Sequence, residues 1–184
     1  MTPATPTLPV ATEFRKVLGH FCTGVTVITG AGPAGFACQA FAALSLDPPL
    51  VLFCPGRGSR TWQAIAGSGR FCVNVLAEDQ QELSARFGRA GADKFTGTAW
   101  SPSPGGAPIL DGVLTWIDCS VEEVRDGGDH HVVIGRVQHL GTCRDAQPLL
   151  FYRGRYTATD QKAERKPNAM LDNLFTWPRH DDWI

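Results

Sequence analysis

Residues 25–41 read VTVITGAGPAGFACQAF, and the way in which this stretch folds decides the class of the protein. Gly30, Gly32 and Gly35 form a G-x-G-x-x-G pattern directly after an apolar, β-branched run. In a dinucleotide-binding fold this pattern opens a helix, and an acidic residue follows about 20 residues later. In an antiparallel protein the same glycines form the turn of a β-hairpin. The two alternatives predict different folds, so the rest of the chain has to separate them.

The residues after the glycines weaken the dinucleotide-binding alternative. The next apolar strand, LVLF at 50–53, runs into Cys54-Pro55-Gly56 and lacks the acidic residue that binds a ribose. Arg57 and Arg60 offer contacts to a 2′-phosphate instead, which keeps an NADP-binding version of that fold open.

An antiparallel hairpin further along the chain favours a barrel. Two strands are expected over 113–124 and 130–140, separated by Asp126-Gly127-Gly128-Asp129, which is a typical hairpin turn. We therefore interpret the glycine pattern as a turn between two barrel strands, and we predict a mainly β protein, a β-barrel with flanking helices. Further strands are expected at 24–29, 50–53, 70–76 and 148–156. Helices are expected to begin at a Thr12 cap and at a Ser59 cap, and to cover 78–87, and a loop is expected over 88–112. The segment 35–46 is ambiguous between strand and helix.

Composition limits the possible functions. The chain has 184 residues, 43% of them hydrophobic, which suits one domain with its own core. A formal net charge of −1 gives no basis for binding nucleic acid, and no apolar run approaches the roughly 20 residues of a membrane span. The first residues lack the basic and apolar regions of a secretory signal, so we expect a cytoplasmic protein. Scattered cysteines with no C-x-x-C pair predict structural thiols and no metal site: Cys22, Cys38, Cys54, Cys72, Cys119 and Cys143.

Three places carry candidate chemistry, each with an ordinary structural alternative. CPGRGSRTW at 54–62 combines a flexible backbone, hydroxyls and a helix start, which is typical both of a phosphate cradle and of a simple helix cap. His130, where a turn becomes a strand, either contacts a ligand or bonds its own loop. The aromatic residues of the final strand either stack on a flat ring or belong to the core; they are Phe151, Tyr152 and Tyr156.

Taken in order, these stretches resemble one family, the flavin reductase-like, FMN-binding split-barrel proteins. The resemblance covers residues 13–156 and is specific in its combination of motifs rather than in any one of them. It is greatest to the reductase components of two-component flavin-dependent monooxygenases, in particular the actinobacterial secosteroid and aromatic hydroxylase reductases. The motifs are FRKVLGHFCTGVTVIT, SLDPPLVLFC, SRTW, SGRFCVNVL, LSARFG, DKF, GDHHVVIG and PLLFYRGRY.

The resemblance implies a fold, a reaction and partners. It implies a homodimeric split barrel over 13–157. Residues 1–12 are expected from their sequence to be a disordered lead, and 158–184 form an extension beyond the common family length. Such a protein passes hydride from NADH, or NADPH, to FAD or FMN, and the reduced flavin diffuses to a separate monooxygenase. A non-enzymatic flavin-binding split barrel is the alternative from another class.

The resemblance also implies site residues. His130 matches the histidine that meets the nicotinamide and is the catalytic candidate, and Tyr152, Arg153 and Gly154 close the nicotinamide side. The flavin-binding residues implied are Ala37, Cys38, Gln39, Ala40, Ala43, Ser45, Ser59, Arg60, Thr61, Arg86, Phe87, Gly88 and Phe95. Many family members carry T-x-N-S-F where this chain has ACQAF at 37–41, so Gln39 is the only polar side chain in that segment besides the thiol. More of the flavin contact therefore falls to the backbone.

Overall fold

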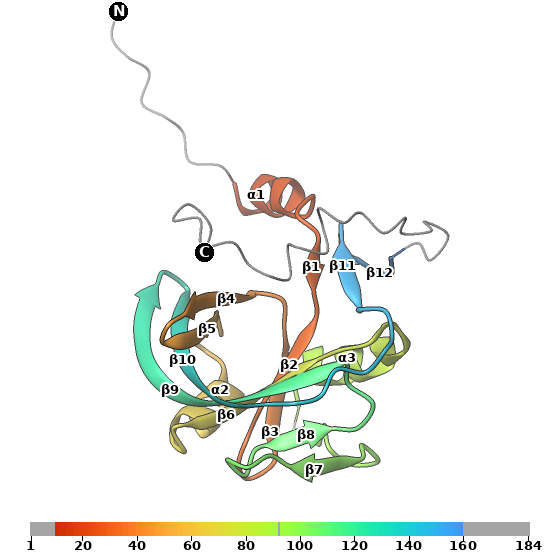
Figure 1. Cartoon of the computed structure of the whole chain (residues 1–184). Coiled ribbons are helices and arrows are strands. Elements are labelled where there is room, and N and C mark those ends of the chain that lie inside the picture. The colour runs from red at the N-terminus through yellow and green to blue at the C-terminus, as the bar shows by residue number, and fades with distance from the viewer. Residues whose placement is uncertain (1–9, 92, 160–184) are drawn as a thin grey trace, which may run out of the picture.

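The computed structural model describes residues 10–91 and 93–159, and these form a curved antiparallel sheet with short helices at its sides (Figure 1). Seven strands form the main sheet in the order β3-β2-β6-β9-β10-β5-β4, and two small sheets join β1 with β11 and β12, and β7 with β8. The elements are α1 (Ala11–Leu18), β1 (Thr23–Gly24), β2 (Thr26–Gly30), β3 (Ala34–Cys38), β4 (Phe41–Leu46), β5 (Pro49–Phe53), α2 (Arg60–Ala66), β6 (Arg70–Val75), η1 (Glu78–Gln80), α3 (Gln81–Gly88), β7 (Trp100–Pro102), β8 (Pro108–Leu110), β9 (Thr115–Gly127), β10 (His130–Leu140), β11 (Leu150–Tyr152) and β12 (Arg155–Thr157). The prediction of a mainly β barrel with flanking helices is confirmed.

The glycine pattern is a hairpin turn, as the chain context predicted. β2 and β3 pair antiparallel with Gly30 opposite Ala34, and Gly32 in the turn has a φ of +77°. The other two glycines make room for helices, because a Cβ would lie 2.7 Å from Ile65 Cγ1 at Gly30 and 2.7 Å from Phe87 Cε1 at Gly35. Hence the pattern serves a tight turn and close helix packing, and the segment 35–46 forms the strands β3 and β4.

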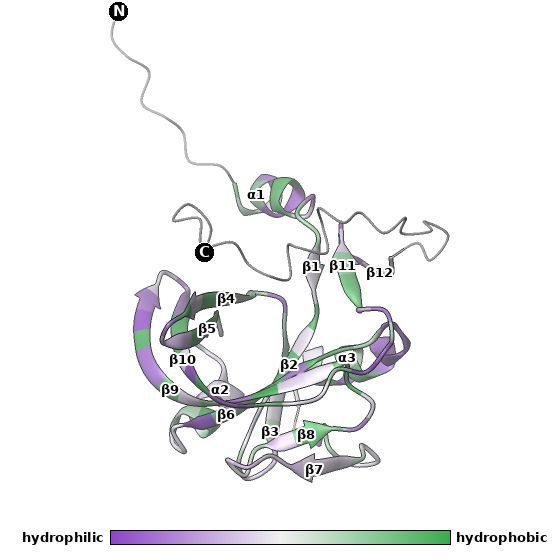
Figure 2. Ribbon diagram, in the orientation of Figure 1, coloured by the Kyte–Doolittle hydropathy of each residue, from purple (hydrophilic) through white to green (hydrophobic). Residues whose placement is uncertain are grey.

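Two apolar clusters fill the fold and place the helices. The first joins α2 to the sheet through Trp62 and Ile65, which pack among buried strand residues such as Phe53 and Phe71. The second places the fully buried ring of Phe87, from α3, against β2 and β8 residues. In Figure 2, β9 carries both purple and green stretches, whereas β11 is mostly green.

Several elements differ from their predicted bounds. α1 begins at Ala11 behind Val10, without the side-chain cap expected from Thr12. The loop expected over 88–112 contains the β7–β8 hairpin, whose three-residue strands are too short to show a periodic pattern. The single last strand is two strands, because Arg153 (φ +50°) and Gly154 (φ +78°) form a tight turn between β11 and β12.

α1 stands apart from the body of the fold (Figure 1), and it contains no buried residue. The apolar face predicted for it is therefore exposed to solvent in the single chain. Its members and the residue after it are 53–76% exposed: Phe14, Val17, Leu18 and Phe21. Most of the expected terminal segments lie outside the described residues, and within 10–91 and 93–159 no helix has the length and apolarity that crossing a membrane requires.

Candidate functional site

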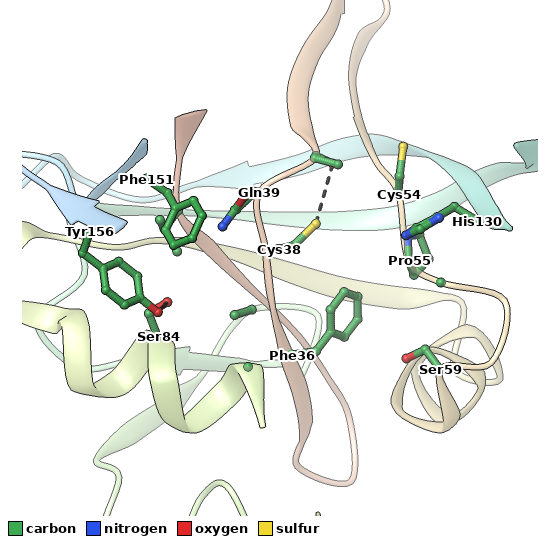
Figure 3. A pocket seen from close by; sticks show the side chains of 15 residues that line it. Phe36, Cys38, Gln39, Cys54, Pro55, Ser59, Ser84, His130, Phe151 and Tyr156 are labelled. Atoms are coloured by element: carbon green, nitrogen blue, oxygen red, sulfur yellow. Dashed lines mark hydrogen bonds between the residues drawn. The ribbon is translucent and has the colours of Figure 1, made fainter. Parts of the chain in front are cut away.

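A pocket of about 490 Å³ opens where β3, α3, the start of β10 and the β11–β12 hairpin meet (Figure 3). Seven of the predicted site residues line it: Ala37, Cys38, Gln39, Ala40, Ser59, Gly88 and His130. Eight further residues complete its walls: Val25, Phe36, Cys54, Pro55, Gly56, Ser84, Phe151 and Tyr156.

The segment between β3 and β4 crosses the pocket with a fixed backbone. Thr26 Oγ1 donates to Cys38 O at 2.8 Å, and the Cys54 N–H donates to Ala40 O at 3.0 Å. The Cys38 thiol contacts Ala40 O at 3.6 Å, which Figure 3 marks with a dashed line. Burial raises the pKa of the Cys38 thiol to about 11, so this thiol is neutral at pH 7. The segment therefore offers a rigid, uncharged edge to a ligand, with Gln39 as its exposed polar side chain.

Ser59 begins α2 and faces the pocket (Figure 3). Its Oγ accepts the Trp62 N–H at 3.1 Å, which confirms the predicted helix cap. Because that contact uses only the acceptor of the hydroxyl, the Ser59 O–H is left to donate to a ligand. The N–H groups of Arg60 and Thr61, the first two of the helix, have no carbonyl within it to bond. The cap and the phosphate cradle are thus compatible interpretations of one segment.

His130 lies at the mouth of the pocket, where the β9–β10 turn becomes β10. Its Nδ1 is 2.7 Å from Asp129 Oδ1, and this hydrogen bond lowers the pKa of the Asp129 carboxyl. The backbone of His130 pairs with Gly56, which places its ring beside Pro55 in Figure 3. Asp129 is largely exposed, so Asp129 and the Gly56 bridge together hold the imidazole at an open rim.

The opposite wall is aromatic. Phe151 and Tyr156 pack edge to face with their ring centroids 5.4 Å apart. Tyr156 Oη lies 3.0 Å from Ser84 Oγ, and Ser84 on α3 is only 2% exposed. Ring stacking was among the predicted roles of Phe151 and Tyr156, but Ser84 shows no signal in the sequence because a serine in a helix is ordinary.

The predicted residues on α3 and after it mostly support the pocket from behind. Phe87 is fully buried and packs edge to face on Phe95 at 5.1 Å, so its ring forms a core contact. Arg86 Nη1 donates to Thr96 O at 3.1 Å and to Thr98 Oγ1 at 2.8 Å. The guanidinium of Arg86 therefore ties α3 to the following loop.

The same loop contributes a lysine. Lys94 Nζ donates to Gly35 O at 3.2 Å and to Phe87 O at 3.0 Å, which joins the loop to β3 and to the end of α3. Burial lowers the pKa of the Lys94 ammonium.

The remaining predicted residues lie outside the lining of the pocket. Ala43 and Ser45 belong to β4, the last strand of the sheet order. Tyr152 lies edge to face with His20 at 6.2 Å, and the Arg153 N–H donates to Gly19 O at 2.8 Å. The turn at 152–154 therefore packs against the end of α1. The two strands that it joins, β11 and β12, contribute Phe151 and Tyr156 to the lining of the pocket.

The side chains that could bind a metal ion are spread over the described structure. Within the described residues, no three His, Cys, Asp or Glu side chains gather where they could hold a metal ion. All six cysteines are free there, with Cys22 and Cys143 exposed.

Residues 18–160 match the model of the flavin reductase like domain family. This match spans the whole described sheet, including every residue that lines the pocket. The chain belongs to the flavin reductase-like family. The resemblance seen in the sequence motifs is confirmed, and with it the split-barrel fold.

Relatives within the flavin reductase-like family extend over nearly the full chain. The reductase subunit HsaB of a flavin-dependent monooxygenase from Rhodococcus jostii is 56% identical over 177 residues, 94% of this chain and 91% of the relative. HsaB of Mycobacterium tuberculosis is 60% identical over 179 residues, 93% of this chain and 95% of the relative.

Solved structures in the same family have the same fold. Nitrilotriacetate monooxygenase component B from Mycobacterium thermoresistibile gives a TM-score of 0.79 at 60% identity, covering 81% of this chain and 86% of that chain. The NADH:FAD oxidoreductase SgcE6 of Streptomyces globisporus, in complex with NAD and FAD fragments, gives a TM-score of 0.81 at 30% identity, covering 87% and 100% respectively.

Proposed function

We propose that this protein is an NAD(P)H:flavin oxidoreductase that reduces FAD or FMN and supplies the reduced flavin to a partner monooxygenase. The observation that carries the proposal is the pocket, in which a rigid backbone edge at 37–40, an aromatic wall and a histidine at the rim enclose a space of about 490 Å³. The membership of the chain in the flavin reductase-like family supports the proposal, as do the monooxygenase reductase subunits among its relatives.

The donor set of the pocket fits a flavin. A flavin supplies a flat ring that accepts hydride from a nicotinamide, and that transfer needs two stacked rings in register rather than a strong acid or base. The 37–40 backbone lies along one edge for such a ring, and the wall of Phe151 and Tyr156 offers it an aromatic surface. The free O–H of Ser59 and the N–H groups that follow it would hold the first phosphate, which FAD and FMN share.

The same pocket suits a flavin that is released after reduction. His130 is the only titratable group other than thiols and a tyrosine among the lining residues, so the lining offers a flavin no permanently charged side chain. The thiols of Cys38 and Cys54 are neutral because burial raises the pKa of both. We infer that a flavin held by backbone groups, ring contact and the Ser59 hydroxyl, without a charged partner in the lining, dissociates and acts as a substrate.

We infer that His130 meets the nicotinamide of NADH, or of NADPH. It stands at the exposed rim, across the pocket from the aromatic wall, where a second ring would enter over the flavin. Its Nδ1 is engaged with Asp129, which leaves Nε2 for the carboxamide of the nicotinamide.

We also propose that the protein is a cytoplasmic homodimer. The exposed apolar face of α1, formed by Phe14, Val17 and Leu18 with Phe21 after it, has no cover within the described part of one chain, and a second copy would bury it. The free thiols agree with a reducing compartment. Phe14→Glu should shift the mass measured by light scattering from two chains to one, whereas an unchanged mass would contradict this interface.

Nicotinamide oxidation by the purified protein tests the function. We expect NADH or NADPH oxidation to be slow without flavin and to saturate as FAD or FMN is added. Flavin binding without nicotinamide oxidation would instead establish the non-enzymatic flavin-binding barrel. In the active protein, His130→Ala should raise the KM for the nicotinamide more than the Kd for flavin, while His131→Ala, outside the lining, should change neither.

A further inference from the structure

Arg57 connects the loop before α2 to the turn between β9 and β10. Its Nε donates to Gly128 O at 2.6 Å, and its Nη2 forms an ion pair with the carboxylate of Asp126. Its backbone N–H also donates to Asp129 O, at 3.0 Å. One residue therefore binds three of the four positions of this turn, through both its side chain and its backbone.

The same turn ends in His130. The backbone of His130 pairs with Gly56, the residue directly before the arginine, and the His131 N–H donates to Pro55 O at 2.9 Å. The ring of His130 in turn bonds Asp129 through Nδ1 at 2.7 Å. The position of the imidazole consequently depends on how the turn is held against the segment 55–57.

We propose that Arg57 is a positioning residue for His130, and that it acts through the β9–β10 turn rather than by binding a phosphate. The sequence suggested an anion contact for Arg57, but its Nε and Nη2 are both engaged with the turn. This inference rests on the proposed role of His130 in nicotinamide binding, and it adds a residue that does not line the pocket.

The contacts between the Arg57 side chain and the β9–β10 turn are suited to positioning His130 and contribute little to the free energy of folding. The side chains of Arg57 and Asp126 are 46% and 76% exposed, and exposed ion pairs of this kind add little to the free energy of folding. Removing either partner leaves the sheet intact and loosens only the turn, so variants at both positions should fold.

Two substitutions separate positioning from simple attraction of an anionic dinucleotide. Arg57→Ala and Asp126→Ala should each raise the KM for NADH about fivefold, the effect of losing one or two exposed polar contacts, with the Kd for flavin unchanged. If Arg57 only attracted the dinucleotide, Asp126→Ala would lower that KM, since it removes a negative charge near the rim. The sign of the Asp126→Ala effect therefore decides between the two.

A control and a double variant complete the test. Arg125→Ala removes an exposed arginine on β9 that pairs with Glu123 and lies outside the turn, and it should leave the KM for NADH unchanged. In the His130→Ala background, Arg57→Ala should have no further effect, because the residue that it positions is gone. Additive effects, an equal loss of flavin binding, or an unchanged KM in Arg57→Ala would each overturn the inference.

The test also distinguishes failure of the inference from failure of the proposed role of His130. If His130→Ala raises the KM for NADH and Arg57→Ala does not, only the positioning role of Arg57 fails. If His130→Ala leaves the KM unchanged, the nicotinamide role of His130 fails and the inference about Arg57 falls with it.

Discussion

Gly35 lies so close to the ring of Phe87 that a Cβ added to it would stand 2.7 Å from Phe87 Cε1. The contact joins β3, whose residues line the pocket, to α3, which supports the pocket from behind. The third glycine of the G-x-G-x-x-G pattern is therefore required by helix packing against a strand rather than by a pyrophosphate.

We expect Gly35→Ala to lower the free energy of unfolding by about 1–3 kcal/mol, the usual cost of overpacking a filled core. Among the described residues no heavy atom lies within 4 Å of a Cβ placed at Gly24, so Gly24→Ala is a matched control. That control should stay within about 0.5 kcal/mol of the wild type. Urea denaturation of both variants would measure the difference, and equal effects would contradict a packing role for Gly35.

Asp118 is fully buried on β9 and forms an ion pair with Arg70 of the neighbouring strand β6, whose side chain is 34% exposed. Arg70 Nη2 lies 3.1 Å from Asp118 Oδ2, Ser103 Oγ donates to Oδ1 at 3.0 Å, and the carboxylate is fully buried. Arg70→Met should cost about 3 kcal/mol, because it leaves a buried charge without its counterion. Adding Asp118→Asn should recover part of that loss by removing the charge. A double variant as unstable as Arg70→Met alone would argue against the electrostatic explanation.

The hydroxyl of Tyr156 pairs with that of the buried Ser84 in the pocket wall. Tyr156→Phe leaves the Ser84 hydroxyl without its partner, so we expect it to lower the free energy of unfolding by about 1 kcal/mol, the usual contribution of one such bond. Urea denaturation would measure this, with Tyr152→Phe outside the pocket lining as the control. Combining Tyr156→Phe with Ser84→Ala should recover part of the lost stability, since removing both partners leaves no unpaired group.

The sequence predicted the sheet elements with strong periodicity and failed where tertiary contacts decide. The β9–β10 hairpin and the Ser59 cap follow from local chemistry, namely a glycine-rich turn and a hydroxyl before a helix. The β7–β8 hairpin and the break at Arg153 do not, because three-residue strands have no period to detect.

The site shows the same division. The segment 37–40, Ser59 and His130 lie on elements that the motifs located, and the structure brings them to one pocket. Alternation along β11 turns Phe151 to the pocket and leaves Tyr152 near His20, outside the lining, so its predicted place beside the nicotinamide stays a prediction. The direction of a side chain in so short a strand depends on its partner strand, which a single sequence does not reveal.

Buried thiols should make the protein less stable above pH 9. Burial raises the pKa of Cys38 to about 11 and that of Cys119 to about 12, from an ordinary value of 9.0. Above pH 9 the unfolded chain loses these protons while the folded chain keeps them, so the free energy of unfolding falls as the pH rises toward 11, by at most about 1.4 kcal/mol per pH unit for each thiol. Cys38→Ala should therefore show a shallower decline between pH 8 and pH 10 in urea denaturation than the wild type. The exposed Cys22, replaced by serine, should leave the slope unchanged. Parallel profiles for the wild type and Cys38→Ala would contradict this prediction, because they would mean that the Cys38 thiol binds its proton equally in the folded and unfolded states.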